Sequence, residues 1–209
     1  MNSRFDPDCR RCPRLAAFLA SVKERHPDYY CRPVPPFGDA QARMLIVGLA
    51  PGLHGANRTG RPFTGDFAGI LLYETLHRLS LASRPVSVAA DDGLTLHNVR
   101  ITNAVKCLPP ANKPEPAEIT TCNAYLRAEL DDFTQGRVIL ALGLIAHGAI
   151  LKALSLRASA HKFAHGAEHA LPGGRILVDS YHCSRYNTQT RRLTAAMFET
   201  VVARALALN

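Results

Sequence analysis

Four of the six cysteines have spacings that suit a shared metal or cluster site. Cys9 and Cys12 have two residues between them, and Cys107 and Cys122 have fourteen. Thiolates from two such pairs can converge on one tetrahedral site. A four-cysteine zinc site normally uses two short-spaced pairs, so the wide second gap favours an iron-sulfur cluster. Zinc, and four free buried cysteines, remain alternatives from spacing alone.

A second group of chemistry-bearing residues follows the first predicted strand, between residues 48 and 66. It comprises Gly48, Ala50, Gly52, Asn57, Arg58, Arg61, Phe63 and Asp66. Glycines let backbone amides approach a ligand closely. An aromatic ring among arginines and glycines suits a flat base stacked on the ring, with phosphates held nearby. A Walker-type nucleotide loop is excluded, because no Gly-Lys-Ser or Gly-Lys-Thr follows.

A third group follows the last predicted strand, at residues 181–192. His182 comes at the strand end, before a polar and basic loop that contains Ser184, Arg185 and Asn187. This pattern fits a hydrogen-bond donor above a reacting atom and a loop that grips nucleic acid. Three other histidines, His161, His165 and His169, recur every four residues, but Glu168 is the only carboxylate nearby, which disfavours a metal site there.

The elements that must position these groups alternate along the chain. Short apolar runs predict strands at 44–49, 99–105, 138–142 and 176–180, and apolar residues at helical spacing predict helices at 13–24, 68–79, 117–133, 144–154 and 190–206. Alternation of this kind indicates one α/β domain, residues 1–209, with a four-stranded parallel sheet flanked by helices. Ligands usually bind beyond the carboxyl ends of such strands, where the second and third groups lie.

Composition narrows the class of protein. The 209 residues are 47% hydrophobic and 20% charged, and the formal charge of +8 favours a polyanionic partner. No run approaches eighteen apolar residues and the first residues lack a signal-peptide pattern, so we expect a soluble, cytoplasmic protein. Cys31 and Cys183 have no partner at ligand spacing, and we expect them to be small buried residues.

Taken together, the motifs resemble those of the uracil-DNA glycosylase superfamily, and within it the family 5 or type b enzymes. The resemblance covers nearly the whole chain and rests on residues 48–52 with their extension to Asp66, on 102–107, on the four cysteines in order, and on Tyr181-His182 with the loop to Thr190. It implies a four-stranded parallel sheet and a 4Fe-4S cluster. The implied cluster ligands are Cys9, Cys12, Cys107 and Cys122.

The resemblance also implies roles for the other two groups. Phe63 would stack on a flipped base, the Asn103 amide would pair with its polar edge, and His182 would donate to a base carbonyl oxygen. The base site would be lined by Gly48, Ala50, Gly52, Phe63, Asn103 and His182, and the DNA contacts would be Asn57, Arg58, Arg61, Ser184, Arg185 and Asn187. Asp66 would orient water or steady the cationic sugar, although an N-cap of the helix at 68–79 is an equal interpretation.

The implied activity is hydrolysis of uracil, and of other deaminated bases, from DNA by a monomeric enzyme, leaving an abasic site. No lysine stands out as a Schiff-base nucleophile, so strand cleavage is not expected. A non-catalytic iron-sulfur or zinc protein that binds nucleic acid is the main alternative, and a redox protein is a weaker one. The chain departs from the family pattern at Cys183, where the family usually has proline after the histidine, which leaves the rigidity of the following loop open.

Overall fold

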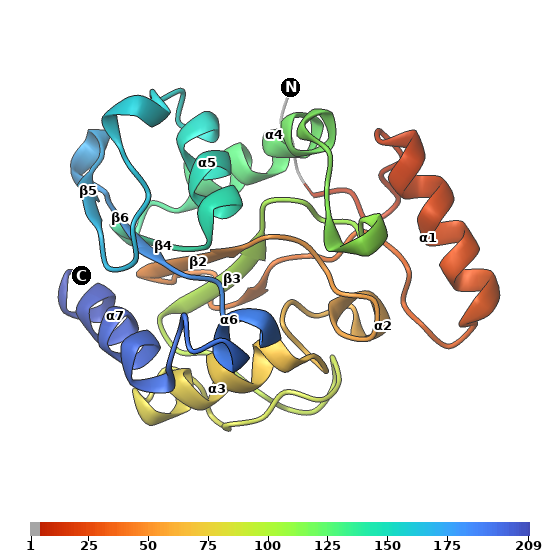
Figure 1. The fold of residues 1–209 in the computed structure, drawn as a ribbon, viewed down its shortest axis with the longest axis horizontal. Coiled ribbons are helices and arrows are strands. Elements are labelled where there is room, and N and C mark those ends of the chain that lie inside the picture. Colours follow the sequence, from red (N-terminus) through yellow and green to blue (C-terminus); the bar gives the residue numbers. More distant parts are fainter. Residues whose placement is uncertain (1–4) are drawn as a thin grey trace.

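A six-stranded sheet runs through the centre of the computed structural model, which describes residues 5–209 (Figure 1). Its order is β1-β3-β2-β4-β6-β5. The four central strands, β3 (Val99–Asn103), β2 (Met44–Gly48), β4 (Val138–Leu142) and β6 (Ile176–Ser180), are parallel. The predicted four-stranded parallel sheet is therefore confirmed.

Two short strands extend this sheet beyond the prediction. At one edge β1 (Phe37–Gly38) pairs with β3, and at the other β5 (Glu168–Ala170) pairs with β6, both antiparallel. Segments of two and three residues are too short to show an alternating pattern. They cover the edges of the parallel sheet, which would otherwise present unpaired backbone groups.

Helices cover both faces of the sheet. In Figure 1, α3 (Phe67–Arg78) and α7 (Ala195–Ala207) lie below it, and α4 (Pro116–Asp132) and α5 (Leu144–Ala153) lie above it. Successive residues of β2 point to opposite faces: Met44 and Ile46 join the core under α3 and α7, whereas Leu45 and Val47 join the core under α4 and α5. This two-sided burial explains why β2 and β4 are continuous apolar runs.

The remaining helices lie towards the ends of the chain and around the strand ends. They are α1 (Pro13–Arg25), α2 (Ala56–Thr59), α6 (Arg185–Gln189), and the 3-10 turns η1 (Pro110–Asn112), η2 (Ala158–Ala160) and η3 (Pro172–Gly174). No helix of the described residues is long and apolar enough to cross a bilayer.

The last helix was predicted to begin too early. Instead of one helix over 190–206, the structure has α6 and then α7, separated by a turn. Each has its own N-cap: the Ser184 side chain accepts from the Asn187 N–H, and the Thr194 side chain accepts from the Met197 N–H. Side-chain acceptors of this kind satisfy the free N–H groups of a first turn, and they divide the segment.

Candidate active site

The carboxyl ends of β2, β3 and β6 meet around one pocket of about 670 Å³. Its lining includes Ala50, Gly52, Phe63, Asp66, Asn103 and His182. Parallel strands bring these residues together from positions far apart in the sequence, because all of their carboxyl ends lie at the same edge of the sheet. The structure thus brings part of the second group and part of the third group of predicted residues into one site.

Asn103 ends β3 with an amide that is almost fully buried. Its Oδ1 atom has no hydrogen-bond partner among the described residues. A buried polar atom without a partner is costly, and such atoms are uncommon in folded proteins. Gly48 makes room for this amide, since a Cβ there would lie 2.5 Å from Asn103 Oδ1 and 2.5 Å from Phe63 Cζ. Glycine at position 48 therefore lets the amide and the aromatic ring approach each other.

His182 lies opposite, with its ring centroid 6.0 Å from that of Phe63 and the two rings inclined by 30°. Burial lowers the pKa of His182 to about 4, so the imidazole is neutral near pH 7. A neutral imidazole offers one N–H donor and one acceptor. The His182 backbone oxygen accepts from Asn187 Nδ2 at 2.8 Å, which fixes the loop behind the ring.

The Cys183 that replaces the family's proline is fully buried in the core beneath α3 and α7. Burial raises the pKa of its thiol, with the nearby Asp66 carboxylate adding to the effect. The loop is therefore held by a buried side chain, by the Ser184 cap and by the Asn187 hydrogen bond, without a proline.

The two carboxylate oxygens of Asp66 have different surroundings. Oδ1 accepts from the Gly69 N–H at 2.9 Å and so caps α3, as one of the two interpretations predicted. Oδ2 lies beside Gly52 and Gly55, in the pocket wall. Burial raises the pKa of Asp66, while the amides of Gly69 and Ala68 oppose this effect. A capping role consequently leaves one carboxylate oxygen available to a ligand.

The predicted DNA contacts separate into two sets. Arg58 and Arg185 are exposed, and the Arg185 guanidinium lies 5.8 Å from the ring centroid of Phe67 at the rim of the pocket. Ser184 also lines the pocket, although its hydroxyl caps α6. The Asn187 amide supports the His182 backbone, and this is its observed contact.

Arg61 and Asn57, which were also predicted to contact DNA, are buried in this structure. Arg61 donates to Asp92 at 2.7 Å and to the Ser87 hydroxyl at 3.0 Å. Burial alone would raise the pKa of Asp92, but amide N–H groups and Arg61 hold it below its ordinary value. Asn57 donates to the Cys31 sulfur at 3.4 Å. Both side chains are therefore engaged inside the protein in this arrangement.

The four cysteines predicted as ligands gather around an apolar cavity between α1, α4 and the loop after β3. Leu15, Val105 and Tyr125 pack beside them, and none of the cysteines forms a disulfide. Burial raises the pKa of Cys107 to about 12 and that of Cys122 to about 11, and the thiols of Cys9 and Cys12 add to both shifts. Four thiols that line one cavity form a donor set that a bound cation would stabilise as thiolates.

A family model of the uracil-DNA glycosylase superfamily matches residues 35–206. The chain belongs to this superfamily. It is 52% identical over 202 residues to a type-5 uracil-DNA glycosylase of Thermus thermophilus, covering 94% of this chain and 92% of that protein. Proteins of the same name from Pyrobaculum aerophilum and Mycobacterium leprae are each 44% identical, over 204 and 203 residues, and cover 96% and 92% of this chain and 88% of their own length.

Several residues in or beside the pocket were not predicted from the sequence. Lys106, in the 102–107 motif, was given no role, yet its buried ammonium group donates to the Asn103 backbone oxygen. Phe67, His54 and Asn112 line the pocket rim. An isolated lysine or asparagine carries no local signal of such contacts. Phe67, an exposed aromatic directly after Asp66, was the one that could have been noticed.

Proposed function

We infer that this chain is a DNA-repair glycosylase that hydrolyses the N-glycosidic bond between uracil and deoxyribose, leaving an abasic site. The observation that carries this conclusion is the buried, unpartnered Oδ1 of Asn103 in a pocket shared with Phe63 and His182. Membership of the superfamily and the type-5 relatives support it. A non-catalytic nucleic-acid-binding protein would give no reason for these three side chains to converge.

Base recognition follows from the pocket chemistry. The edge of uracil presents an N3–H donor beside a carbonyl acceptor, and the Asn103 amide offers the matching acceptor and donor. An unpartnered Oδ1 gains a hydrogen bond when the base enters. The Phe63 ring supplies an apolar surface for stacking, and only an extruded nucleotide can reach this depth.

Bond cleavage is assisted by His182 and Asp66. As the glycosidic bond breaks, negative charge develops on the base, and the neutral His182 donates a hydrogen bond to its carbonyl oxygen. The Asp66 oxygen that does not cap α3 faces the pocket, where it orients the attacking water or steadies the cationic sugar. No lysine is needed, and the product is an intact strand with an abasic site.

Cys9, Cys12, Cys107 and Cys122 would hold a 4Fe-4S cluster. The fit is supported by the four thiols, one buried and three partly buried, that line one cavity, and by the Lys106 backbone N–H, which donates to the Cys122 sulfur at 3.3 Å. When bound, the cluster supplies a cross-link. It joins the segment before α1 to the loop after β3 and to α4, and therefore to the elements that carry Asn103.

DNA is held by the exposed rim of the site. Arg185, which lines the pocket together with Ser184, and the exposed Arg58 are the basic residues proposed to contact phosphates. The pocket also admits other deaminated bases that share a carbonyl and an adjacent N–H. We propose that the protein acts as a monomer in the cytoplasm, where cysteines remain reduced.

Excision of uracil from a labelled duplex, followed by alkaline cleavage at abasic sites, tests the proposed activity. We expect cleavage at the uracil position, reduced about 100-fold or more in Asn103→Ala and in His182→Ala. His97→Ala, which changes an exposed histidine outside the pocket, should act like the wild type. Intact DNA with wild-type protein, for uracil and for other deaminated bases, would contradict the proposal.

The cluster is tested separately by iron analysis and visible absorption of protein purified without oxygen. We expect about four iron atoms per chain. Cys107→Ala and Cys122→Ala should lose iron, whereas Cys31→Ser, at a buried cysteine outside the group, should retain it. Colourless wild-type protein that binds zinc through sulfur would replace the cluster with a zinc site.

A further inference from the structure

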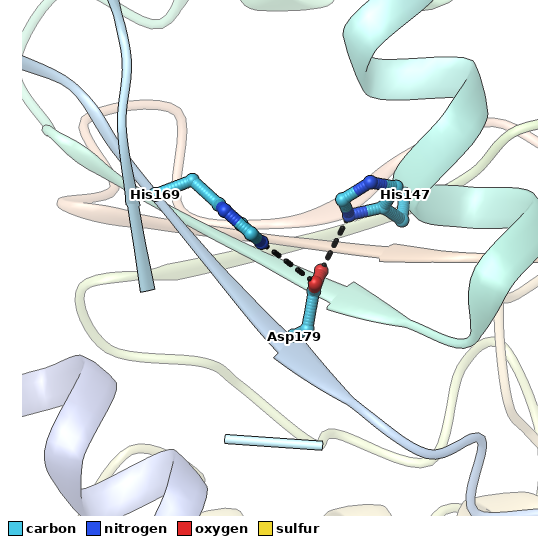
Figure 2. Close-up of side chains that lie close together, drawn as sticks. All are labelled: His147, His169 and Asp179. Carbon is cyan, nitrogen blue, oxygen red and sulfur yellow. Dashed lines mark hydrogen bonds and ion pairs between the residues drawn. The ribbon is translucent and has the colours of Figure 1, made fainter. Parts of the chain in front are cut away.

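Three side chains from three elements, two of them buried and one partly buried, meet outside the base pocket (Figure 2). They are His147 of α5, His169 of β5 and Asp179 of β6. His147 Nδ1 lies 2.8 Å from Asp179 Oδ1, and His169 Nε2 lies 3.0 Å from Asp179 Oδ2. Figure 2 shows both rings directed at the carboxylate. The four-residue histidine repeat does not create this group, because only His169 of that repeat belongs to it.

The Asp179 carboxylate is fully buried, and the two imidazoles are its partners. No lysine or arginine of residues 5–209 pairs with it. A buried carboxylate is strongly disfavoured unless a positive charge is close. The buried Asp179 carboxylate therefore requires a cation within this group of three side chains.

The partners of the two ring nitrogens of His147 indicate the position of that cation. Its Nε2 atom is 2.9 Å from the backbone oxygen of His161, and its Nδ1 atom faces the Asp179 carboxylate. Both partners are acceptors, and a neutral imidazole has a single N–H. If Nε2 carries that hydrogen, a lone pair on Nδ1 points at a carboxylate oxygen. A proton or a metal ion must then lie between the two atoms.

The donor set has the features of a transition-metal site. Two imidazole nitrogens and a carboxylate oxygen, all within 4.8 Å of one another, are ligands that zinc accepts. Histidines that bind metals usually donate their other N–H to a backbone carbonyl or a carboxylate, as His147 can do to His161. The edge of the Phe163 ring packs on His147, with 5.6 Å between the centroids.

The chain around His169 has only partly buried apolar contacts, with Leu154 and Leu156 packed against the core under α4 and α5. None of residues 154–170 is buried, although this segment contains η2 and β5. The segment nevertheless contacts the third motif, because the Tyr181 N–H donates to His165 Nδ1 at 3.2 Å. Segments with little buried surface are those that metal ligands commonly fasten.

We propose that His147, His169 and Asp179 bind a zinc ion, which fastens residues 154–170 to β6 next to the His182 loop. The hydrogen-bonded arrangement in Figure 2 is the metal-free form. In this form one proton lies between His147 Nδ1 and Asp179 Oδ1, as the two acceptors of His147 require. Zinc binding releases this proton from the His147–Asp179 pair, while the Nε2 hydrogen of His169 moves to Nδ1. The site is distinct from the cysteine group and does not depend on base excision.

Zinc chloride is the probe, added to the full-length protein with its cysteine site as isolated. We expect about one zinc ion per chain to remain after gel filtration, with nitrogen and oxygen ligands at about 2.0 Å in X-ray absorption. His169→Ala and Asp179→Asn should weaken binding at least about 10-fold. His165→Ala, in the same segment but outside the ligand group, should bind as the wild type does.

Three outcomes would overturn the proposal. They are the absence of retained zinc, retention through sulfur alone at about 2.3 Å, and equal affinity in the wild type and His169→Ala. Each would mean that the group holds only a proton. Should Asp179→Asn fail to fold, His169→Ala decides, because His169 lies on a short edge strand and its loss leaves the central sheet unchanged.

Discussion

The ammonium group of Lys106 donates a hydrogen bond to the backbone oxygen of Asn103 over 2.9 Å. The same group contacts the Thr102 hydroxyl and forms an ion pair with Glu129 at 2.8 Å. The backbone N–H of Lys106 donates to the sulfur of Cys122. One buried residue thus connects a cysteine of the proposed cluster to the amide proposed to read the base.

We predict that Lys106→Met lowers both stability and excision. Removing the ammonium leaves Glu129 in a largely buried position without its partner, which should reduce the free energy of unfolding by about 2–4 kcal/mol. The Asn103 backbone also loses a donor, so kcat/KM for uracil should fall about 10-fold or more. Urea unfolding and single-turnover excision measure the two effects.

The double variant Lys106→Met/Glu129→Leu separates folding from positioning. It leaves no buried charge, so stability should largely return while activity stays low. If activity recovers together with stability, Lys106 acts only on folding. Lys152→Met, at an exposed lysine of α5, is the matched control and should change neither quantity.

Asp66→Asn should separate catalysis from helix capping. Asparagine caps helices about as well as aspartate, so stability should stay within about 0.5 kcal/mol of the wild type. The negative charge facing the pocket is lost, and kcat should fall much more than KM rises. Asp66→Ala should lose about 1 kcal/mol of stability as well. Wild-type kcat in Asp66→Asn would limit this residue to capping.

The neutrality of His182 predicts a pH dependence. Because burial lowers its folded-state pKa to about 4 from an ordinary 6.5, the unfolded chain binds more protons between these two values. Stability should therefore decline as the pH falls from 6.5 to 4, by up to about 3 kcal/mol from this residue. His182→Gln should lack this part of the decline, which urea unfolding at several pH values would show.

The same neutrality applies to catalysis. If His182 acts as a neutral donor, the excision rate should not fall between about pH 6 and 8, since the imidazole does not titrate there. A wild-type rate that declines as the pH rises, with a midpoint near pH 6.5, would instead indicate that His182 acts as an imidazolium. His182→Gln should then lack this decline.

The central sheet was predictable because β2 and β4 are buried on both faces, and strands buried in this way are continuous apolar runs in the sequence. The pocket residues were predictable because they follow those strands. Contacts between distant segments were not predictable. Arg58 and Arg61 are both arginines and lie three residues apart. Arg58 is exposed, whereas Arg61 is buried and pairs with Asp92, thirty-one positions along the chain. Asp179 likewise lies outside the histidine repeat that contains its partner His169.

The difference between Arg61 and Arg185 can be measured directly. Arg185→Ala removes an exposed cation at the rim, so DNA binding should weaken and the slope of log K against log salt should become shallower by about one ion. Arg61→Met should leave that slope unchanged. It removes the partner of the buried Asp92 carboxylate instead, and should cost about 3–5 kcal/mol in the free energy of unfolding. A changed salt slope in stably folded Arg61→Met would show that this side chain reaches DNA after all, and would require residues 87–92 to open when DNA binds.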